Sequence, residues 1–178
     1  MTRALVAITN VGDYRRAASD LHEFISAYPN DDIESEFPGT LVQYSSLTSA
    51  QHNLERLIKS HSPGFREIFV VFAGTHAVGQ AIVTVSNNPP DAVDPSSPNV
   101  SGWIARPYRG QGIGKFSLRE RLKVVEERFG GSAWTLVNKT NMISENNVRA
   151  AGFRCVSAEI QDWPQHNLFA WKSFSQEP

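Results

Sequence analysis

Two apolar runs, residues 67–73 and 78–85, lie on either side of the short segment 74–77, which begins with a glycine. Both runs are rich in β-branched and aromatic residues, so the pair predicts a β-hairpin with a short glycine-containing turn. Strand-like and helix-like segments follow one another along the rest of the chain, without an internal repeat or a visible linker. The sequence therefore predicts a mixed α/β (α+β) fold in one domain, residues 1–178.

The segments around the hairpin carry common start and stop signals of helices and strands. A first strand is expected over residues 5–9, followed by a helix that Asp13 caps and that stops at Pro29. Thr48 opens a second helix, which ends before Ser62. Beyond the hairpin we expect helices from the segment 109–114 to Gly130 and over residues 144–151, and strands over residues 100–106, 134–137, 153–156 and 168–174.

The 17 basic and 18 acidic residues of the 178-residue chain leave a net charge of -1. A chain without a global positive field is not expected to bind nucleic acid or an anionic membrane surface. No apolar run approaches the ~18 residues of a membrane span, and the first residues lack the features of a signal peptide. The acidic run 31–36 indicates either a solvated loop or an attraction for a cationic amine.

Cys155 is the only cysteine of the chain. It excludes an intramolecular disulfide and a cysteine-rich zinc site, so we expect no metal and a reducing, cytoplasmic location. Cys155 follows Gly152 and Phe153 on a predicted strand. A small buried hydrophobic side chain is a better interpretation of this cysteine than a nucleophile.

Residues 86–99 contain four prolines among asparagine, aspartate and serine residues. Proline has no backbone N–H to donate, so a segment of this composition cannot keep regular hydrogen-bonded structure. A loop of this length in a compact domain either forms a wall or lid of a substrate site or is a surface excursion.

The segment Arg109–Lys115 contains three glycines between a predicted strand and a predicted helix. Glycine lets the backbone approach a ligand closely, and the first turn of a helix points unsatisfied N–H groups outward. Together these features predict an anion site suited to a pyrophosphate, with Arg109 and Lys115 adding positive charge. The spacing excludes a Walker loop, because Phe116 follows the lysine, and a dinucleotide fingerprint, because single residues separate the glycines.

Two further patterns accompany this segment. Arg109, Gly112 and Gly114 fit Arg-x-x-Gly-x-Gly, and the run Asn141–Ser144 is followed by Gly152-Phe153. Both patterns resemble signatures of the Gcn5-related N-acetyltransferases, the first being the acetyl-CoA-binding loop. Residues 102–107 are similar to the branch that contains the ribosomal-protein N-terminal acetyltransferases. The resemblance covers residues 66–174.

This resemblance implies the acyl-CoA N-acyltransferase fold, a mostly antiparallel central sheet of six to seven strands, splayed at the fourth strand and flanked by about four helices. It implies direct transfer of an acetyl group from acetyl-CoA, as co-substrate, to a primary amine of a small molecule or peptide. A homodimer is one alternative for the assembly. The residues implied in cofactor binding are Trp103, Ile104, Arg109, Gly110, Gln111, Gly112, Gly114, Lys115, Asn141 and Asn147.

Several of these residues have a second interpretation. Gly102, inside the expected fourth strand, marks either a close ligand approach or a strand irregularity. Trp103 is equally a residue that packs in the sheet. Asn141 is equally a turn residue.

The catalytic groups depart from the family pattern. Val148 stands where many members carry a tyrosine that protonates the leaving thiolate, so Ser144 is the candidate acid, with a helix cap as its alternative role. The fourth strand offers no carboxylate, which makes Asp94 or Asp91 the candidate base and leaves His76 or ordered water as alternatives. A chain that kept the cofactor site but lost this chemistry would be a CoA-binding sensor or interaction domain.

Overall fold

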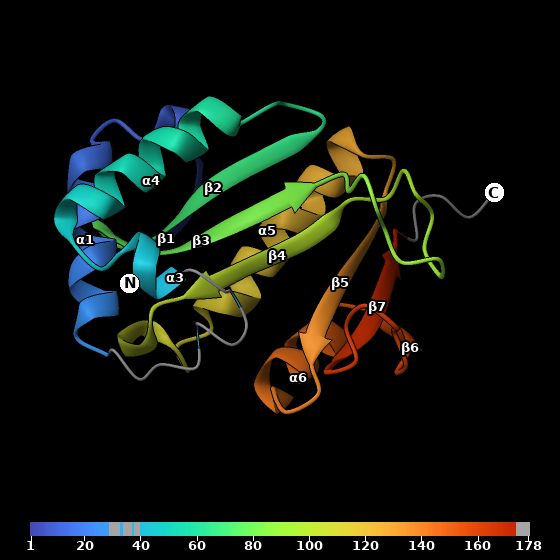
Figure 1. The fold of residues 1–178 in the computed structure, drawn as a ribbon. Coiled ribbons are helices and arrows are strands. Elements are labelled where there is room, and N and C mark those ends of the chain that lie inside the picture. Colours follow the sequence, from blue (N-terminus) through green and yellow to red (C-terminus); the bar gives the residue numbers. More distant parts are fainter. Residues whose placement is uncertain (29–32, 34–36, 38–39, 174–178) are drawn as a thin grey trace. The chain divides into compact units, whose positions relative to one another are not determined.

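The computed structural model of the protein describes residues 1–28, 33, 37 and 40–173 (Figure 1). Its strands are β1 (Arg3–Ala7), β2 (Arg66–Ala73), β3 (His76–Thr84), β4 (Asn99–Ile104), β5 (Ser132–Asn138), β6 (Arg154–Ser157) and β7 (His166–Lys172). Its helices are α1 (Tyr14–Ser26), α3 (Thr40–Gln43), α4 (Leu47–Ser60), α5 (Ile113–Arg128) and α6 (Met142–Ala150), with 3-10 helices η1 (Ile8–Asn10) and η2 (Arg106–Tyr108). Pro29, the acidic residues of the run 31–36 and Phe174 lie outside the described residues.

The described strands form a sheet in the order β1-β2-β3-β4-β5-β7-β6. β1 with β2, β5 with β7 and β6 with β7 pair antiparallel, whereas β4 and β5 pair in parallel at Asn99 and Trp134. This mixed, mostly antiparallel sheet confirms the predicted fold class. The splay at the fourth strand stays a prediction.

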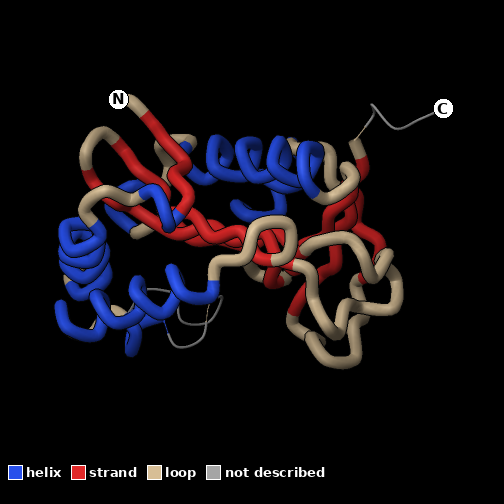
Figure 2. Tube along the Cα trace, turned by 90° about the horizontal axis from the view of Figure 1, so that it is seen from above, coloured by secondary structure: helices blue, strands red, loops and turns tan. Residues whose placement is uncertain are grey.

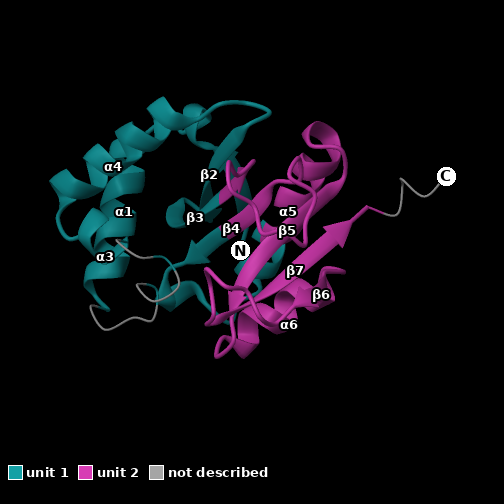
Figure 3. Cartoon of the chain, turned by 45° about the vertical axis from the view of Figure 1, so that its right-hand side comes forward, with its two compact units in different colours: residues 1–81, 102–117 teal, residues 82–101, 118–178 magenta. Residues whose placement is uncertain are grey.

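The chain divides into two compact units (Figure 3). Unit 1 comprises residues 1–81 and 102–117, and unit 2 comprises residues 82–101 and 118–178. Strands β3 and β4 and helix α5 each run from one unit into the other. The prediction of a single domain stays a prediction.

In unit 1, α1 and α4 pack against each other on one face of the strands (Figure 2). The Asp13 carboxylate accepts a hydrogen bond from the Arg16 N–H at 2.9 Å, which confirms the predicted cap of α1. Helix α4 begins earlier than predicted. Its cap is Ser46, whose Oγ accepts from the Ser49 N–H at 3.1 Å, and Thr48 lies inside the first turn.

The hairpin of unit 1 is confirmed, with a tighter turn than the sequence suggested. Only Gly74 and Thr75 separate β2 from β3, and Gly74 takes φ +63°, a conformation that favours glycine. His76 already belongs to β3, and the Ala77 N–H donates to the Asp20 carboxylate of α1 at 2.9 Å. Most residues of both strands are buried, as expected for strands with apolar runs rather than alternation.

The fourth strand is shorter than predicted. β4 ends at Ile104, and η2 follows as a single turn over Arg106–Tyr108. Pro107 explains the difference, because its fixed φ and missing N–H suit the first turn of a helix and not a continued strand. This turn leads directly into the glycine-rich segment.

In unit 2, β7 lies between β5 and β6, so β6 is an edge strand. Helix α5 ends at Arg128, just before the predicted stop at Gly130 and Gly131, which both take φ +76°. The prediction that Cys155 is buried is wrong. Its side chain is exposed on β6, because an edge strand with only one packed neighbour leaves most of its side chains in solvent.

The proline-rich segment is irregular, as predicted, but its second end is anchored within unit 2. The buried Ser97 accepts a hydrogen bond from the Trp134 indole N–H at 3.0 Å through its carbonyl oxygen. Its hydroxyl lies 2.6 Å from the Ser132 hydroxyl, and the Trp134 N–H donates to the Pro98 carbonyl at 3.0 Å. This end of the segment is therefore held against β5. Among the described residues, no helix is long and apolar enough to cross a membrane.

Candidate functional site

The glycine-rich segment of unit 1 joins η2 to α5 through two backbone positions that favour glycine. Gly110 takes φ +74° and Gly112 takes φ +73°. An L-residue with a side chain rarely adopts such angles, so these two glycines allow the chain to reverse between η2 and the first turn of α5. The prediction of a glycine-rich turn that opens a helix is confirmed.

Side chains brace the carbonyl oxygens of this segment. The Arg109 Nε–H donates to the Ile104 carbonyl at 2.9 Å, and the Gln111 side-chain amide donates to the Pro107 carbonyl at 3.1 Å. The Arg3 guanidinium, from β1, donates to the Gln111 carbonyl at 2.5 Å and to the Gly112 carbonyl at 3.5 Å. The polar contacts of these side chains thus hold the loop in shape.

The backbone amides of the same segment remain available. Within the described part of the chain, the N–H groups of Gly110 and Gly112 have no backbone acceptor within hydrogen-bond distance. The Phe116 N–H donates to the Gly112 carbonyl at 3.1 Å and so starts the hydrogen-bond pattern of α5, whose first amides have no partner in the helix. Lys115 is exposed beside them. A diphosphate accepts hydrogen bonds. A loop whose carbonyls already have donors and whose amides have no acceptor is therefore suited to bind one.

Arg3 contacts the glycine-rich segment, and the sequence did not predict this contact. It lies more than a hundred positions before the glycine-rich segment, on a strand whose pairing with β2 only the structure shows. Its side chain is exposed, as is usual for an arginine, so nothing in the local sequence marks it as a contact residue. A spacing pattern cannot detect such a contact.

The strand before the loop is packed tightly in unit 1. A Cβ atom on Gly102 would lie 2.6 Å from the Gln80 carbonyl oxygen, so this glycine is required by the approach of β3. Trp103 is buried, and its ring meets the Tyr44 ring edge-on with 5.7 Å between the centroids. These contacts support the interpretation of Gly102 and Trp103 as sheet-packing residues.

A buried polar cluster surrounds the hydroxyl of Tyr44, whose ring contacts Trp103. It consists of the Tyr44 hydroxyl, the Asn53 side-chain nitrogen and the Gln80 side-chain nitrogen, none of which has a hydrogen-bond partner among the described residues. Burial raises the pKa of the Tyr44 phenol, and the nearby amides of Asn53 and Gln80 oppose this shift in part. Arg56 donates to the Asn53 side-chain oxygen at 2.8 Å. No motif in the sequence marks these residues.

In unit 2, Asn141 caps α6. Its side-chain oxygen accepts from the Ser144 N–H at 2.9 Å, so the role of helix cap belongs to Asn141 and not to Ser144. Ser144 is half-buried in the first turn, and its hydroxyl has no hydrogen-bond partner in the described part of the chain. Val148 is buried, and Asn147 is half-buried on the same helix.

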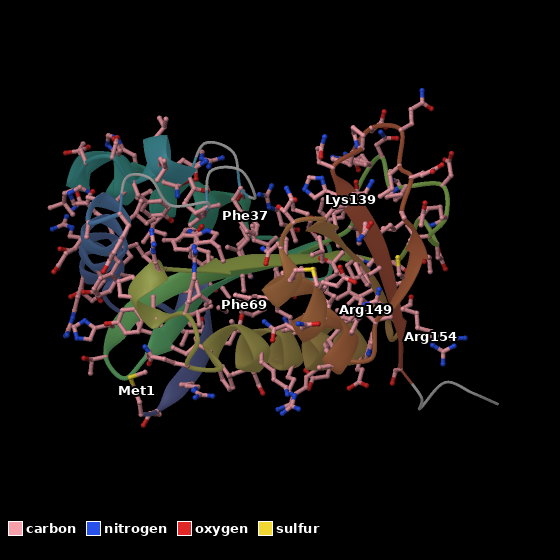
Figure 4. All side chains as sticks on the ribbon, turned by 90° about the horizontal axis from the view of Figure 1, so that it is seen from below. Met1, Phe37, Phe69, Lys139, Arg149 and Arg154 are labelled. Carbon is pink, nitrogen blue, oxygen red and sulfur yellow. The ribbon has the colours of Figure 1, made fainter. Side chains whose placement is uncertain are left out.

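The last turn of α6 is stabilised by interactions of a charged side chain, Arg149. Arg149, labelled in Figure 4, forms an ion pair with Glu145 one turn earlier, with 2.8 Å between Nη2 and Oε1. Its guanidinium also lies over the Phe169 ring of β7, at 5.1 Å from the centroid. The basic residue of the last turn is thus structural.

The candidate bases are both exposed. Asp94 accepts hydrogen bonds at one oxygen from the Ser96 N–H at 2.8 Å and the Ser96 hydroxyl at 2.7 Å. These bonds lower the pKa of Asp94 and so weaken it as a proton acceptor. The His76 Nδ1 atom lies 3.5 Å from the Asp20 carboxylate, on the hairpin of unit 1. Asp91 is exposed in the proline-rich loop.

The structure therefore gathers one set of predicted residues within each unit. Unit 1 holds the set from Trp103 to Lys115, in which the glycine-rich segment and its braces are in direct contact. Unit 2 holds Asp94, Asn141, Ser144 and Asn147, of which only Asn141 and Ser144 are hydrogen-bonded to each other.

The fold is similar to that of solved acetyltransferases. RimL, a ribosomal alpha-N-protein acetyltransferase in complex with coenzyme A, matches with a TM-score of 0.68 and 15% identity over 97% of this chain and 94% of its own. RimJ of Mycobacterium smegmatis, in complex with CoA-disulfide, matches with 0.65 and 18% over 98% and 88%. The microcin self-immunity acetyltransferase MccE, in complex with acetyl-CoA and AMP, matches with 0.69 and 13% over 96% and 92%.

No family model matches the sequence, and no curated protein is similar to it in sequence. The likeness therefore lies in the fold, which is the acyl-CoA N-acyltransferase fold that the glycine-rich and Asn-x-x-Ser patterns implied.

Proposed function

We propose that the protein is an acetyl-CoA-dependent N-acetyltransferase that moves an acetyl group directly to a primary amine of a small molecule or peptide. The observation that carries the proposal is the glycine-rich loop of unit 1, where side chains hold the carbonyls and the amides of Gly110 and Gly112 are free just before α5. Solved proteins of the same fold, bound to coenzyme A or acetyl-CoA, support it.

In the proposed reaction, a neutral amine forms a C–N bond to the acetyl carbonyl carbon while the C–S bond breaks. The amine nitrogen loses a proton, and the departing thiolate takes one up. Ser144 supplies that proton, since its half-buried hydroxyl has no other partner in the described residues. The backbone N–H near Ile104 polarises the thioester carbonyl.

Proton removal from the amine is assigned to ordered water. Asp94 is the base expected from the sequence, but its lowered pKa argues against that role because a stronger acid makes a weaker base. His76 keeps a carboxylate neighbour in Asp20 and remains the second alternative. A cytoplasmic location completes the proposal, since the single cysteine suits a reducing compartment.

A second function is favoured by Val148. This buried aliphatic residue provides no acid at the position where many family members carry a tyrosine, which would suit a CoA-binding sensor or interaction domain. The two functions share the cofactor loop and differ in turnover.

The test has two steps. Calorimetric titration with acetyl-CoA and CoA measures binding, and thiol release from acetyl-CoA is then followed with a panel of polyamines, aminoglycosides and peptides with free N-termini. Binding with amine-dependent release supports the acetyltransferase. Binding without release from any of these acceptors supports the sensor, and an absence of heat with both ligands contradicts both functions.

A further inference from the structure

Arg3 holds two consecutive peptide planes of the cofactor loop. Its guanidinium donates to the carbonyl oxygens of Gln111 and Gly112 at 2.5 Å and 3.5 Å. Arg3 itself is fixed by the pairing of β1 with β2, where it lies opposite Ala73. The Gln111 carbonyl is therefore directed toward a charged group on β1. The Gly112 carbonyl is shared, because it also accepts the first hydrogen bond of α5, from the Phe116 N–H at 3.1 Å.

The direction of these carbonyls sets the direction of the adjacent amides. In a planar trans peptide the C=O and N–H bonds point to opposite sides. With the Gln111 and Gly112 carbonyls turned toward Arg3, the N–H groups of Gly112 and Ile113 point away from it. Gly112 takes φ +73° and Ile113 is the first residue of α5, so both amides are free of partners in regular structure.

We propose that Arg3 is a positioning residue for the cofactor loop, which orients the Gly112 and Ile113 amides toward a phosphate group of CoA. The inference rests on the proposed function. Arg3 acts from the carbonyl side of the peptides, so it is not itself a ligand of that phosphate. The planar guanidinium suits this task because its fixed fork can reach two carbonyl oxygens at once, which the single ammonium of lysine does not reproduce.

The experiment compares Arg3→Met, Arg3→Lys and Arg16→Ala with the wild type. Arg16 is an exposed arginine of unit 1 whose guanidinium donates to the Thr75 hydroxyl at 3.4 Å, and it serves as the matched control. Calorimetry gives the Kd of CoA at several salt concentrations, and a thermal melt shows that each variant is folded. Steady-state rates with an acceptor from the panel separate KM from kcat.

Loss of the brace is expected to raise the Kd of CoA about tenfold in Arg3→Met, comparable to the loss of a charged hydrogen bond. Arg3→Lys should recover only part of the affinity. The KM of acetyl-CoA should rise while kcat stays unchanged, and the salt dependence of Kd should keep its wild-type slope, because the phosphate contacts are backbone amides. In NMR spectra of the free protein, the Gly112 and Ile113 amide signals should shift in both Arg3 variants and not in Arg16→Ala.

Three results would overturn the inference. A wild-type Kd in Arg3→Met shows that the brace is dispensable. Full recovery by lysine shows that charge and not orientation matters, and a reduced salt slope in Arg3→Met shows that Arg3 contacts the phosphate directly. These outcomes differ from failure of the proposed function, in which the wild-type protein itself does not bind CoA.

Discussion

Gly79 and Trp103 approach each other across β3 and β4 so closely that a Cβ atom on Gly79 would overlap the Trp103 carbonyl oxygen. Gly102 makes a similar approach to the Gln80 carbonyl. The two glycines allow the backbones of the strands to come together beside the loop that η2 and α5 enclose. Neither has a positive φ, so the requirement is for space and not for an unusual conformation.

Gly79→Ala should therefore lower the free energy of unfolding by about 1–3 kcal/mol, the usual range for overpacking a site that cannot yield. Chemical denaturation measures the change. Gly12→Ala is the control, because a Cβ there meets no atom within 4 Å. Equal stability of Gly79→Ala and Gly12→Ala would show that β3 and β4 adjust to the extra methyl group.

Tyr44→Phe should leave stability unchanged or raise the free energy of unfolding by up to about 1 kcal/mol, because it removes a buried hydroxyl without a described partner. The ring and its edge-on contact with Trp103 are preserved. Tyr44→Ala, which also empties the volume of the ring, should cost about 3–5 kcal/mol. A clear loss of stability in Tyr44→Phe would reveal a bound water or ligand oxygen on the hydroxyl, shared with Asn53 and Gln80.

Substitutions at Asn141 should change stability, whereas substitutions at Ser144 should change kcat. Asn141→Ala removes the cap of α6 and should lower the free energy of unfolding by about 1 kcal/mol, whereas Asn141→Asp retains it. Ser144→Ala should leave the melting temperature close to that of the wild type and lower kcat by about tenfold, as expected for loss of a proton donor. An unchanged kcat in Ser144→Ala would remove this residue from the proposed mechanism.

The contribution of Asp94 to folding stability should depend on pH. Its pKa is lowered in the folded state by the two Ser96 hydrogen bonds, so its ionised form favours folding above the unfolded-state pKa. That contribution is lost as the pH falls through the folded-state pKa. The same lowered pKa makes the carboxylate a weaker proton acceptor, so Asp94→Asn should leave kcat within about twofold of the wild type. A large decrease in kcat that is greatest at low pH would identify Asp94 as the base.

Local signals in the sequence predicted the local structure well. Asp13 before an amphipathic segment and the paired glycines at 130–131 mark helix ends through backbone rules that act within a few residues. Gly110 and Gly112 could be recognised for the same reason. Boundaries were less accurate where neighbouring signals compete, as when Ser46 capped α4 in place of Thr48.

Features that depend on the order of the strands in the sheet could not be predicted from the sequence. Cys155 is exposed because β6 lies at the edge of the sheet, and nothing in its own segment distinguishes an edge strand from a central one. The contact between Arg3 and the cofactor loop depends equally on where β1 pairs. The Tyr44 cluster joins α4, β3 and the residue after α3, so its convergence is a property of the packed unit.

The contact of Arg3 with the Gln111 and Gly112 carbonyls spans 108 and 109 positions of the chain. Closing a loop of that length costs conformational entropy, which the other contacts of unit 1 offset. A ligand that binds only the completed loop stabilises that state by mass action. If Arg3 orients the loop amides as proposed, CoA binding also stabilises the pairing of β1 with β2, because the ligand favours the state in which Arg3 reaches the loop.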